Sequence, residues 1–115
     1  IYINIGPIRQ WGVPANKSRA DHWHEYSEAI QAYSPAAVLV DGRFRVACIC
    51  QAILALQEDG IIMVHDFWNR KHYHAVLPFL EVYDKVETLA VFKVKPDLDR
   101  AQVEALWQKY QKDYR

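Results

Sequence analysis

The stretch of residues 37–67 constrains the fold more than any other part of the chain. It holds two short apolar runs, residues 38–40 and 61–64, and each run is followed by a loop that carries an aspartate. Residues 46–57, between the two runs, are almost wholly apolar and long enough for a helix. This order predicts two adjacent parallel strands, buried on both faces and joined by a crossover helix.

The loops that follow these two strands are the expected place for function. Ligands of open parallel sheets bind outside the carboxyl ends of the strands, so both loops should open onto one crevice. The first loop spans residues 41–45 and the second spans residues 65–70. Their polar side chains are therefore the candidate site.

The other elements fit one α/β domain over residues 1–115. In chain order they are a strand over residues 1–5, a loop over 8–19, a helix over 21–33 capped by Asp21, a short helix over 73–80 that bends or ends near Pro78, antiparallel strands over 82–86 and 88–94 at one edge of the sheet, and an amphipathic helix capped by Asp97 or Asp99.

Composition excludes few classes of protein. The chain has 115 residues, and its 14 basic residues balance 14 acidic ones, so its charge indicates neither a nucleic-acid nor a membrane partner. No apolar run approaches the ~20 residues of a membrane-spanning helix. No signal-peptide pattern is present. We therefore expect a soluble, cytoplasmic protein.

The only cysteines, Cys48 and Cys50, lie two apart in the predicted buried helix. Side chains at positions i and i+2 of a helix point in different directions, which argues against a mutual disulfide. We interpret both as small buried apolar side chains.

Asp41 and Asp66 follow the two central strands, so their carboxylates are expected to converge. Two carboxylates with waters suit Mg²⁺, and we predict a metal site if they lie within about 8 Å of each other. The alternative is that Asp41 caps a turn with Gly42 and Asp66 caps the following helix.

His65 is a candidate general base, because its ordinary pKa of ~6.5 suits proton transfer near neutral pH. The alternative is a strand-end histidine bonded to the backbone. His65 and Asp66 are the candidate catalytic residues. The pairs His22/His24 and His72/His74 suggest zinc only weakly, since a helix does not place both rings of a pair on one face.

Positive charge gathers around the same crevice from Arg43, Arg45 and Arg70. With Tyr73, they are the candidate substrate-binding residues, and arginine forks suit an anionic substrate. The alternative is that Arg43 and Arg45 pair with the nearby carboxylates and hold the loops together. Aromatic side chains could floor a pocket or belong to the core: Trp11, Trp23, Phe44, Phe67, Trp68 and Tyr73.

The element order resembles the second half of class I S-adenosylmethionine-dependent methyltransferases. The strings VDG at 40–42 and HDF at 65–67 are similar to the acidic loops of metal-dependent sugar and small-molecule O-methyltransferases. The strings DGRFRVAC and HDFWNRKHY, with IGP at 5–7 and WGVP at 11–14, also resemble a methyltransferase-like family. The resemblance implies a partial Rossmann-like three-layer sandwich. It also implies O-methyl transfer from S-adenosylmethionine to a small molecule or sugar, with Mg²⁺ at the acidic loops.

The glycine-rich loop that holds the cofactor in such enzymes has no counterpart here, because the chain has only four glycines and no two are close together. By the resemblance, residues 1–5 correspond to the third strand of that fold, and the first two strands are missing. The expectation is a chain incomplete at its N-terminus, a rearranged first strand, or a partner that fills the gap. No residue is assigned to cofactor binding, and S-adenosylmethionine binding by this chain alone is expected to be weak.

Two classes of function remain open from the sequence. The first is a methyltransferase-like enzyme that further strands or a partner chain complete. The second is a non-catalytic Rossmann-like subunit that serves in protein assembly. Both classes predict that the chain associates with a second copy of itself or with a partner chain.

Overall fold

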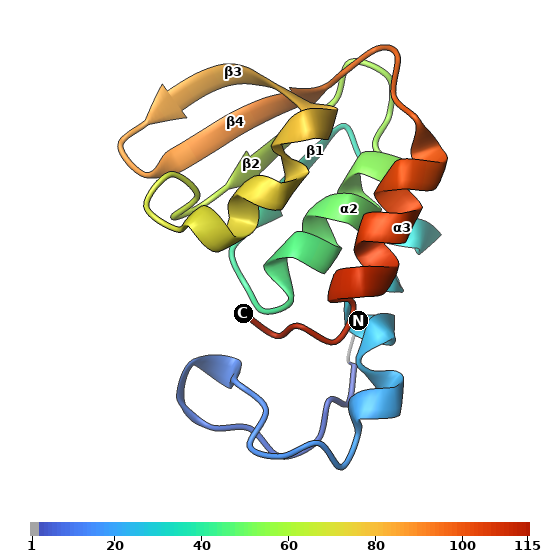
Figure 1. Ribbon diagram of the computed structural model, residues 1–115, viewed down its shortest axis with the longest axis vertical. Helices are drawn as coiled ribbons and strands as arrows, with labels where there is room; N and C mark the ends of the chain where they lie inside the picture. Colours follow the sequence, from blue (N-terminus) through green and yellow to red (C-terminus); the bar gives the residue numbers. More distant parts are fainter. Residues whose placement is uncertain (1–2) are drawn as a thin grey trace.

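The computed structural model describes residues 3–115 (Figure 1). Its helices and strands, with η for a 3₁₀ helix, are η1 (Gln10–Gly12), η2 (Ala20–His22), α1 (His24–Glu28), η3 (Ala29–Ala32), β1 (Ala37–Val40), α2 (Arg45–Ala55), β2 (Ile61–Val64), η4 (Lys71–Phe79), β3 (Leu80–Val86), β4 (Leu89–Val94) and α3 (Arg100–Tyr110). No helix in this described part of the chain is long and apolar enough to cross a membrane.

The four strands form one mixed sheet in the order β1-β2-β4-β3. β1 and β2 are parallel, with Val40 opposite Val64, and α2 is the crossover between them. β4 runs antiparallel to both β2 and β3. The predicted central pair, its crossover helix and the antiparallel pair at one edge are confirmed, and so is a Rossmann-like α/β fold.

Helix α2 is the centre of the core, since eight of its eleven residues are buried. In Figure 1 it lies between the sheet and α3, and it also contacts α1, η3 and η4. No side chain caps its first turn. Instead, the backbone N–H groups of Phe44 and Arg45 donate to backbone oxygens of Tyr114 and Arg115, at 3.2 and 3.4 Å. Residues distant in sequence thus satisfy the donors at the start of α2.

Helix α3 closes the core on the side of α2 away from the sheet. The side chain of Asp99 accepts a hydrogen bond from the Ala101 backbone, so Asp99 rather than Asp97 is the cap. Val103 and Trp107 are buried, and the Trp107 indole donates to the Ser27 hydroxyl at 2.8 Å. The predicted amphipathic helix is therefore confirmed.

The two faces of the sheet differ in how they are covered. Val40, Val64 and Ala90 point into the core. Their neighbours Leu39, Met63 and Val91 form a row on the opposite face, which we call the outer face, and this row is absent from the core and from the side chains packed on it. Residues 3–115 thus form the sheet and one helical layer of the sandwich.

Burial of β1 on both faces was expected and is wrong, since Leu39 is 60% exposed. The local cause is that β1 is an edge strand whose outer face meets no element within residues 3–115.

The first expected strand is also not found. Residues 1 and 2 of that prediction lie outside the described part, and residues 3–5 pair with no strand. The Ile5 carbonyl instead accepts a hydrogen bond from the buried Trp23 indole, at 2.9 Å.

The predicted single helix over residues 21–33 is divided into η2, α1 and η3. Trp23 is only 2% exposed because its ring enters the core, whereas Tyr33, at the end of the expected helix, is 58% exposed. Asp21 does not act as a cap. A short helix gains little from its own hydrogen bonds, so packing of Trp23 outweighs a regular helix.

The edge of β1 and the outer face predict association, because an unpaired strand edge and exposed apolar side chains both favour contact with another chain. We expect Leu39→Lys to shift the wild-type protein from oligomer toward monomer in sedimentation velocity. Tyr33→Lys, which places the same charge at an exposed site away from the sheet, should leave the distribution unchanged. A wild-type protein that is monomeric at all concentrations would contradict this prediction.

Candidate functional site

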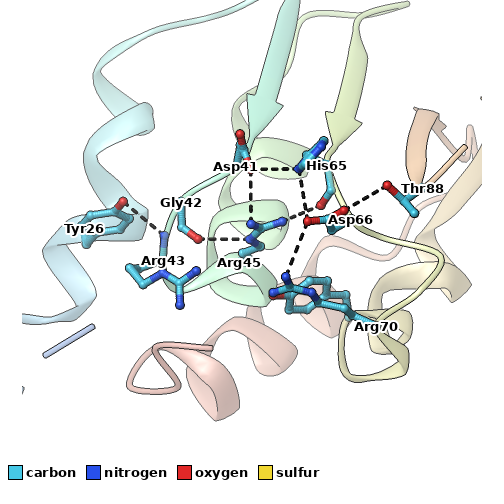
Figure 2. A network of polar contacts seen from close by, with 10 residues as sticks. Tyr26, Asp41, Gly42, Arg43, Arg45, His65, Asp66, Arg70 and Thr88 are labelled. Carbon is cyan, nitrogen blue, oxygen red and sulfur yellow. Dashed lines mark hydrogen bonds and ion pairs between the residues drawn. The ribbon is translucent and has the colours of Figure 1, made fainter. Parts of the chain in front are cut away.

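The two loops lie side by side, as expected from the parallel register of β1 and β2. Because Val40 is opposite Val64, the next residues, Asp41 and His65, leave the sheet together. The His65 backbone N–H donates to the Val40 carbonyl at 3.2 Å and extends the pairing by one bond. Figure 2 shows the polar contacts that join these loops.

The His65 ring lies between two carboxylates. Its Nδ1 is 3.3 Å from an oxygen of Asp41 and 3.3 Å from an oxygen of Asp66. Both are ion-pair distances, and a hydrogen bond from Nδ1 to either carboxylate requires the proton on Nδ1, because an ionised carboxylate only accepts hydrogen bonds. In the neutral ring Nε2 is then the acceptor, and the side chain is 51% exposed. The alternative of a ring bonded to the backbone is not what the structure shows.

Arg45 joins the two loops through its buried side chain. Its side chain is 5% exposed, and it donates to the Gly42 carbonyl at 3.1 Å, to the His65 carbonyl, and to Asp41 at 3.3 Å. Its guanidinium also lies 5.4 Å from the centre of the Tyr73 ring. Arg45 therefore holds the loops together, which was one of the two roles expected from the sequence.

Asp66 is held by three partners. Besides His65, its oxygens contact the Thr88 hydroxyl at 2.9 Å and Arg70 at 3.5 Å. Its backbone is left-handed, with φ 54°, a conformation that aspartate tolerates better than most residues. Arg70 in turn donates to the Tyr73 hydroxyl at 3.3 Å.

Gly42 is required by a close approach rather than by its own backbone angles. A Cβ at this position would lie 2.7 Å from the Tyr26 hydroxyl, closer than Cβ atoms approach in proteins, so the Tyr26 side chain would have to shift. The same hydroxyl accepts a hydrogen bond from the Arg43 backbone at 3.4 Å. Tyr26 on α1 thereby fixes the turn between β1 and α2.

A cavity of 550 Å³ opens at these loops. Its walls come from both loops and from the segment before α1, and they are Trp11, Val13, Asp41, Gly42, Arg43, Arg45, His65, Asp66 and Arg70. A second cavity, of 560 Å³, lies at the opposite end of β2, near Asp59 and Lys93. The convergent polar network is at the first, which we take as the candidate site.

The predicted site residues divide into two groups in the structure. Asp41, Arg43, His65, Asp66 and Arg70 meet at the cavity, and so does the buried Arg45. Tyr73 does not line the cavity. It is 2% exposed and supports Arg45 and Arg70 from behind, so its expected direct contact with substrate is not supported.

Asp66 does not cap the helix that follows it, the alternative that was open from the sequence, because the residue before η4 is Arg70 and this helix has no side-chain cap bond. The alternative for Asp41 was a turn with Gly42, but the hydrogen-bond partner of its carboxylate within residues 3–115 is the Arg45 side chain and not the backbone of that turn.

Two contributors to the site were missed from the sequence, Thr88 and Tyr26. Thr88 follows from register: β2 and β4 are antiparallel with Val64 opposite Ala90, so continuing the register by two residues brings Asp66 to Thr88. The pairing of β2 with β4 was not predicted, and without it Thr88 carries no signal. Tyr26 comes from the divided helix and also has no local signal.

Magnesium finds little support in this donor set. The two carboxylate oxygens each lie 3.3 Å from the same nitrogen, so they are close enough for the distance that we required. However, Arg45 and Arg70 already contact these carboxylates, and their charges repel a divalent cation. Within residues 3–115, no group of three or more His, Cys, Asp or Glu residues could hold a metal. The pairs His22/His24 and His72/His74 therefore belong to no such group.

Cys48 and Cys50 are free; Cys50 is buried in the core, and Cys48 is partly buried and packs against it. Burial raises the pKa of the Cys48 thiol to about 12, against a smaller opposing effect of the Arg45 charge. Burial also raises the pKa of the Cys50 thiol to about 12, with a further contribution from Cys48. Both therefore stay protonated near neutral pH, as expected of apolar packing residues.

The fold and the place of the site define a class, the Rossmann-like proteins with a polar crevice at the carboxyl ends of parallel strands. Among solved structures, the chain is similar to a methyltransferase-like protein from Silicibacter pomeroyi, with a TM-score of 0.84 and 26% sequence identity. The match covers 97% of this chain and 60% of that chain, and it supports a methyltransferase-like fold. Comparisons of the sequence with protein-family models and with curated proteins give no match.

The buried position of Arg45 predicts a large effect on stability. Arg45→Met keeps an apolar stem but leaves the Gly42 and His65 carbonyls without their donor. We expect a loss of about 2–4 kcal/mol in the free energy of unfolding, measured with urea. Arg43→Met is the matched control, since no contact within residues 3–115 engages the Arg43 guanidinium, and it should change stability by less than about 0.5 kcal/mol. Equal effects of the two changes would refute the role of Arg45.

Proposed function

We propose that this chain is the acceptor-binding part of a methyltransferase-like enzyme that transfers a methyl group to a hydroxyl of a small molecule or sugar. The observation that carries the proposal is the position of His65, with Nδ1 between Asp41 and Asp66 and the ring at the wall of a 550 Å³ cavity. The similarity to a methyltransferase-like protein supports the reaction class.

His65 has the geometry of a general base. With Nδ1–H donated to a carboxylate, Nε2 can accept the proton of an acceptor hydroxyl in the cavity. The imidazolium that forms is then positive next to Asp41 and Asp66, which stabilise it. Asp66 is a positioning residue in this scheme, since Thr88 and Arg70 hold its carboxylate against the ring.

The methyl group would come from S-adenosylmethionine, which supplies an electrophilic sulfonium methyl when bound. The residues described here do not form its cradle, because Gly6, Gly12, Gly42 and Gly60 are dispersed and none lies in a glycine-rich loop. A cavity on the α1 side of β1 measures only 240 Å³. We therefore assign cofactor binding to further strands or to a partner chain.

A second candidate function is a non-catalytic subunit in a protein assembly. The free edge of β1 and the exposed outer face favour it, since they offer backbone groups and apolar area to another chain. An assembly subunit has no need of a histidine base, so the behaviour of His65 distinguishes the two functions.

The missing cradle predicts that the isolated chain binds S-adenosylmethionine weakly. In a calorimetric titration we expect no saturation below about 1 mM, because the backbone donors that would fix the cofactor are absent. Tight binding with one molecule per chain would show that residues of this chain form a cofactor site of another kind.

The proposed base predicts a large loss of activity when His65 is replaced. In the full-length gene product, His65→Asn should lower kcat by about 10²–10⁴-fold, in a radiolabelled methyl-transfer assay over small-molecule hydroxyl acceptors. His22→Asn, at an exposed histidine paired with Glu25, should leave kcat unchanged.

A readout independent of turnover is the ¹⁵N spectrum of the His65 ring. It should show the neutral ring protonated at Nδ1, and the combined change Asp41→Asn and Asp66→Asn should abolish this preference. Full activity of His65→Asn, or a ring protonated at Nε2, would sink the proposed role of His65.

A further inference from the structure

The Trp11 side chain lines the cavity but has no part in the proposed proton transfer. It is 81% exposed, the most exposed of the large apolar side chains in the described chain. Its backbone is left-handed, with φ 66°, a conformation that bulky residues rarely adopt. An exposed indole on such a backbone contributes little to folding, and strained positions of this kind gather at ligand sites.

The loop that carries Trp11 is closed at its base, so the backbone that carries the indole is restrained. The Arg9 N–H donates to the Val13 carbonyl at 2.6 Å, and the Ala15 N–H donates to the Pro7 carbonyl at 2.8 Å. An isolated β-bridge pairs Ile8 with Pro14. Trp11 is therefore at the tip of a fixed hairpin-like loop rather than on a freely moving segment.

The three arginines at the cavity differ in whether a carboxylate pairs with them. Arg45 contacts Asp41 and Arg70 contacts Asp66. The guanidinium of Arg43 has no hydrogen bond or ion pair within residues 3–115, and Figure 2 shows it apart from the network. Arg43 is thus the cation available to an anion in the cavity.

Arg43 and the Trp11 loop are neighbours. A Cβ built on Gly12 would lie 3.8 Å from Arg43 Cγ, in ordinary contact. The Trp11 loop and the stem of Arg43 are therefore adjacent, and both residues line the cavity.

We infer that the cavity binds a planar aromatic carboxylate that bears a hydroxyl group. The ring would stack on Trp11, the carboxylate would pair with Arg43, and the hydroxyl would face Nε2 of His65. The cavity volume lies within the range of small-molecule sites. The inference rests on the proposed function only for the fate of the hydroxyl, since binding needs residues of this chain alone.

The test uses three probes that differ in one property each. 4-Hydroxybenzoate has the ring, the carboxylate and the hydroxyl; phenol lacks the carboxylate; 4-hydroxycyclohexanecarboxylate lacks the flat ring. Each is titrated into the ¹⁵N-labelled chain, with the Trp11 indole N–H signal as the reporter. We expect 4-hydroxybenzoate to shift this signal and to bind about tenfold more tightly than either other probe.

Three variants separate the contributions. Arg43→Gln should weaken 4-hydroxybenzoate about tenfold and leave phenol unchanged. Trp11→Gly, followed through the Gly12 backbone amide because this variant has no indole at position 11, should weaken both aromatic probes about tenfold. Trp11→Gly also relieves the left-handed backbone, so its thermal midpoint should not fall. Lys17→Gln removes an exposed positive charge in the same segment, away from the cavity wall, and should bind like the wild type.

The inference fails if the probes bind equally, if Lys17→Gln weakens binding as much as Arg43→Gln, or if the Trp11 signal does not move. These outcomes are separable from failure of the proposed function. Binding of 4-hydroxybenzoate without methylation by the full-length gene product would overturn methyl transfer and keep the ligand class. Methylation of neutral, non-planar acceptors alone would overturn the ligand class and keep methyl transfer.

Discussion

The site depends on the hydrogen bonds that the buried guanidinium of Arg45 makes to both loops. Arg45 is the first residue of α2, where the positive end of the helix dipole disfavours a cation, and it is only 4% exposed. Such a charge is stable only if its donors are satisfied, and the Gly42 and His65 carbonyls and the Asp41 carboxylate do this. These acceptors come from both loops. The hydrogen bonds that satisfy Arg45 therefore also hold His65 next to Asp41.

The same sheet that builds the site is covered on only one side by residues 3–115. The core face holds the helical layer around α2, while Leu39 and its row face outward. The chain spans 60% of the length of the methyltransferase-like protein that it matches. In the proposed function, different parts of the fold would build the acceptor side and the cofactor side of the site, so the His65 network does not depend on a cofactor cradle within this chain. The site chemistry and the ability to bind S-adenosylmethionine must therefore be judged separately.

The sequence predicted what local patterns encode. Unbroken apolar runs specified β1, β2 and α2, and the parallel crossover predicted that Asp41 and Asp66 converge, but not that the His65 ring lies 3.3 Å from an oxygen of each. The split of the helix over residues 21–33 was not predictable, because it depends on the Trp23 indole finding the distant Ile5 carbonyl. Thr88 was missed for a similar reason, since its approach to Asp66 depends on the pairing of β2 with β4. The roles of Arg43 and Arg45 were left open because burial, which the sequence does not show, decides between them.

The two carboxylates at His65 are not equivalent, although each lies 3.3 Å from Nδ1. Nδ1 carries one hydrogen and in the neutral ring can donate it to only one of them at a time. Asp66 is 25% exposed and restrained by Thr88 and Arg70, whereas Asp41 is 51% exposed and restrained only by Arg45. Ordering costs less for a group that is already fixed, so in the proposed mechanism Asp66 would orient the ring. Asp41 would then stabilise the imidazolium that the proposed proton transfer forms, so the exposed carboxylate would have an electrostatic role and the restrained one a geometric role.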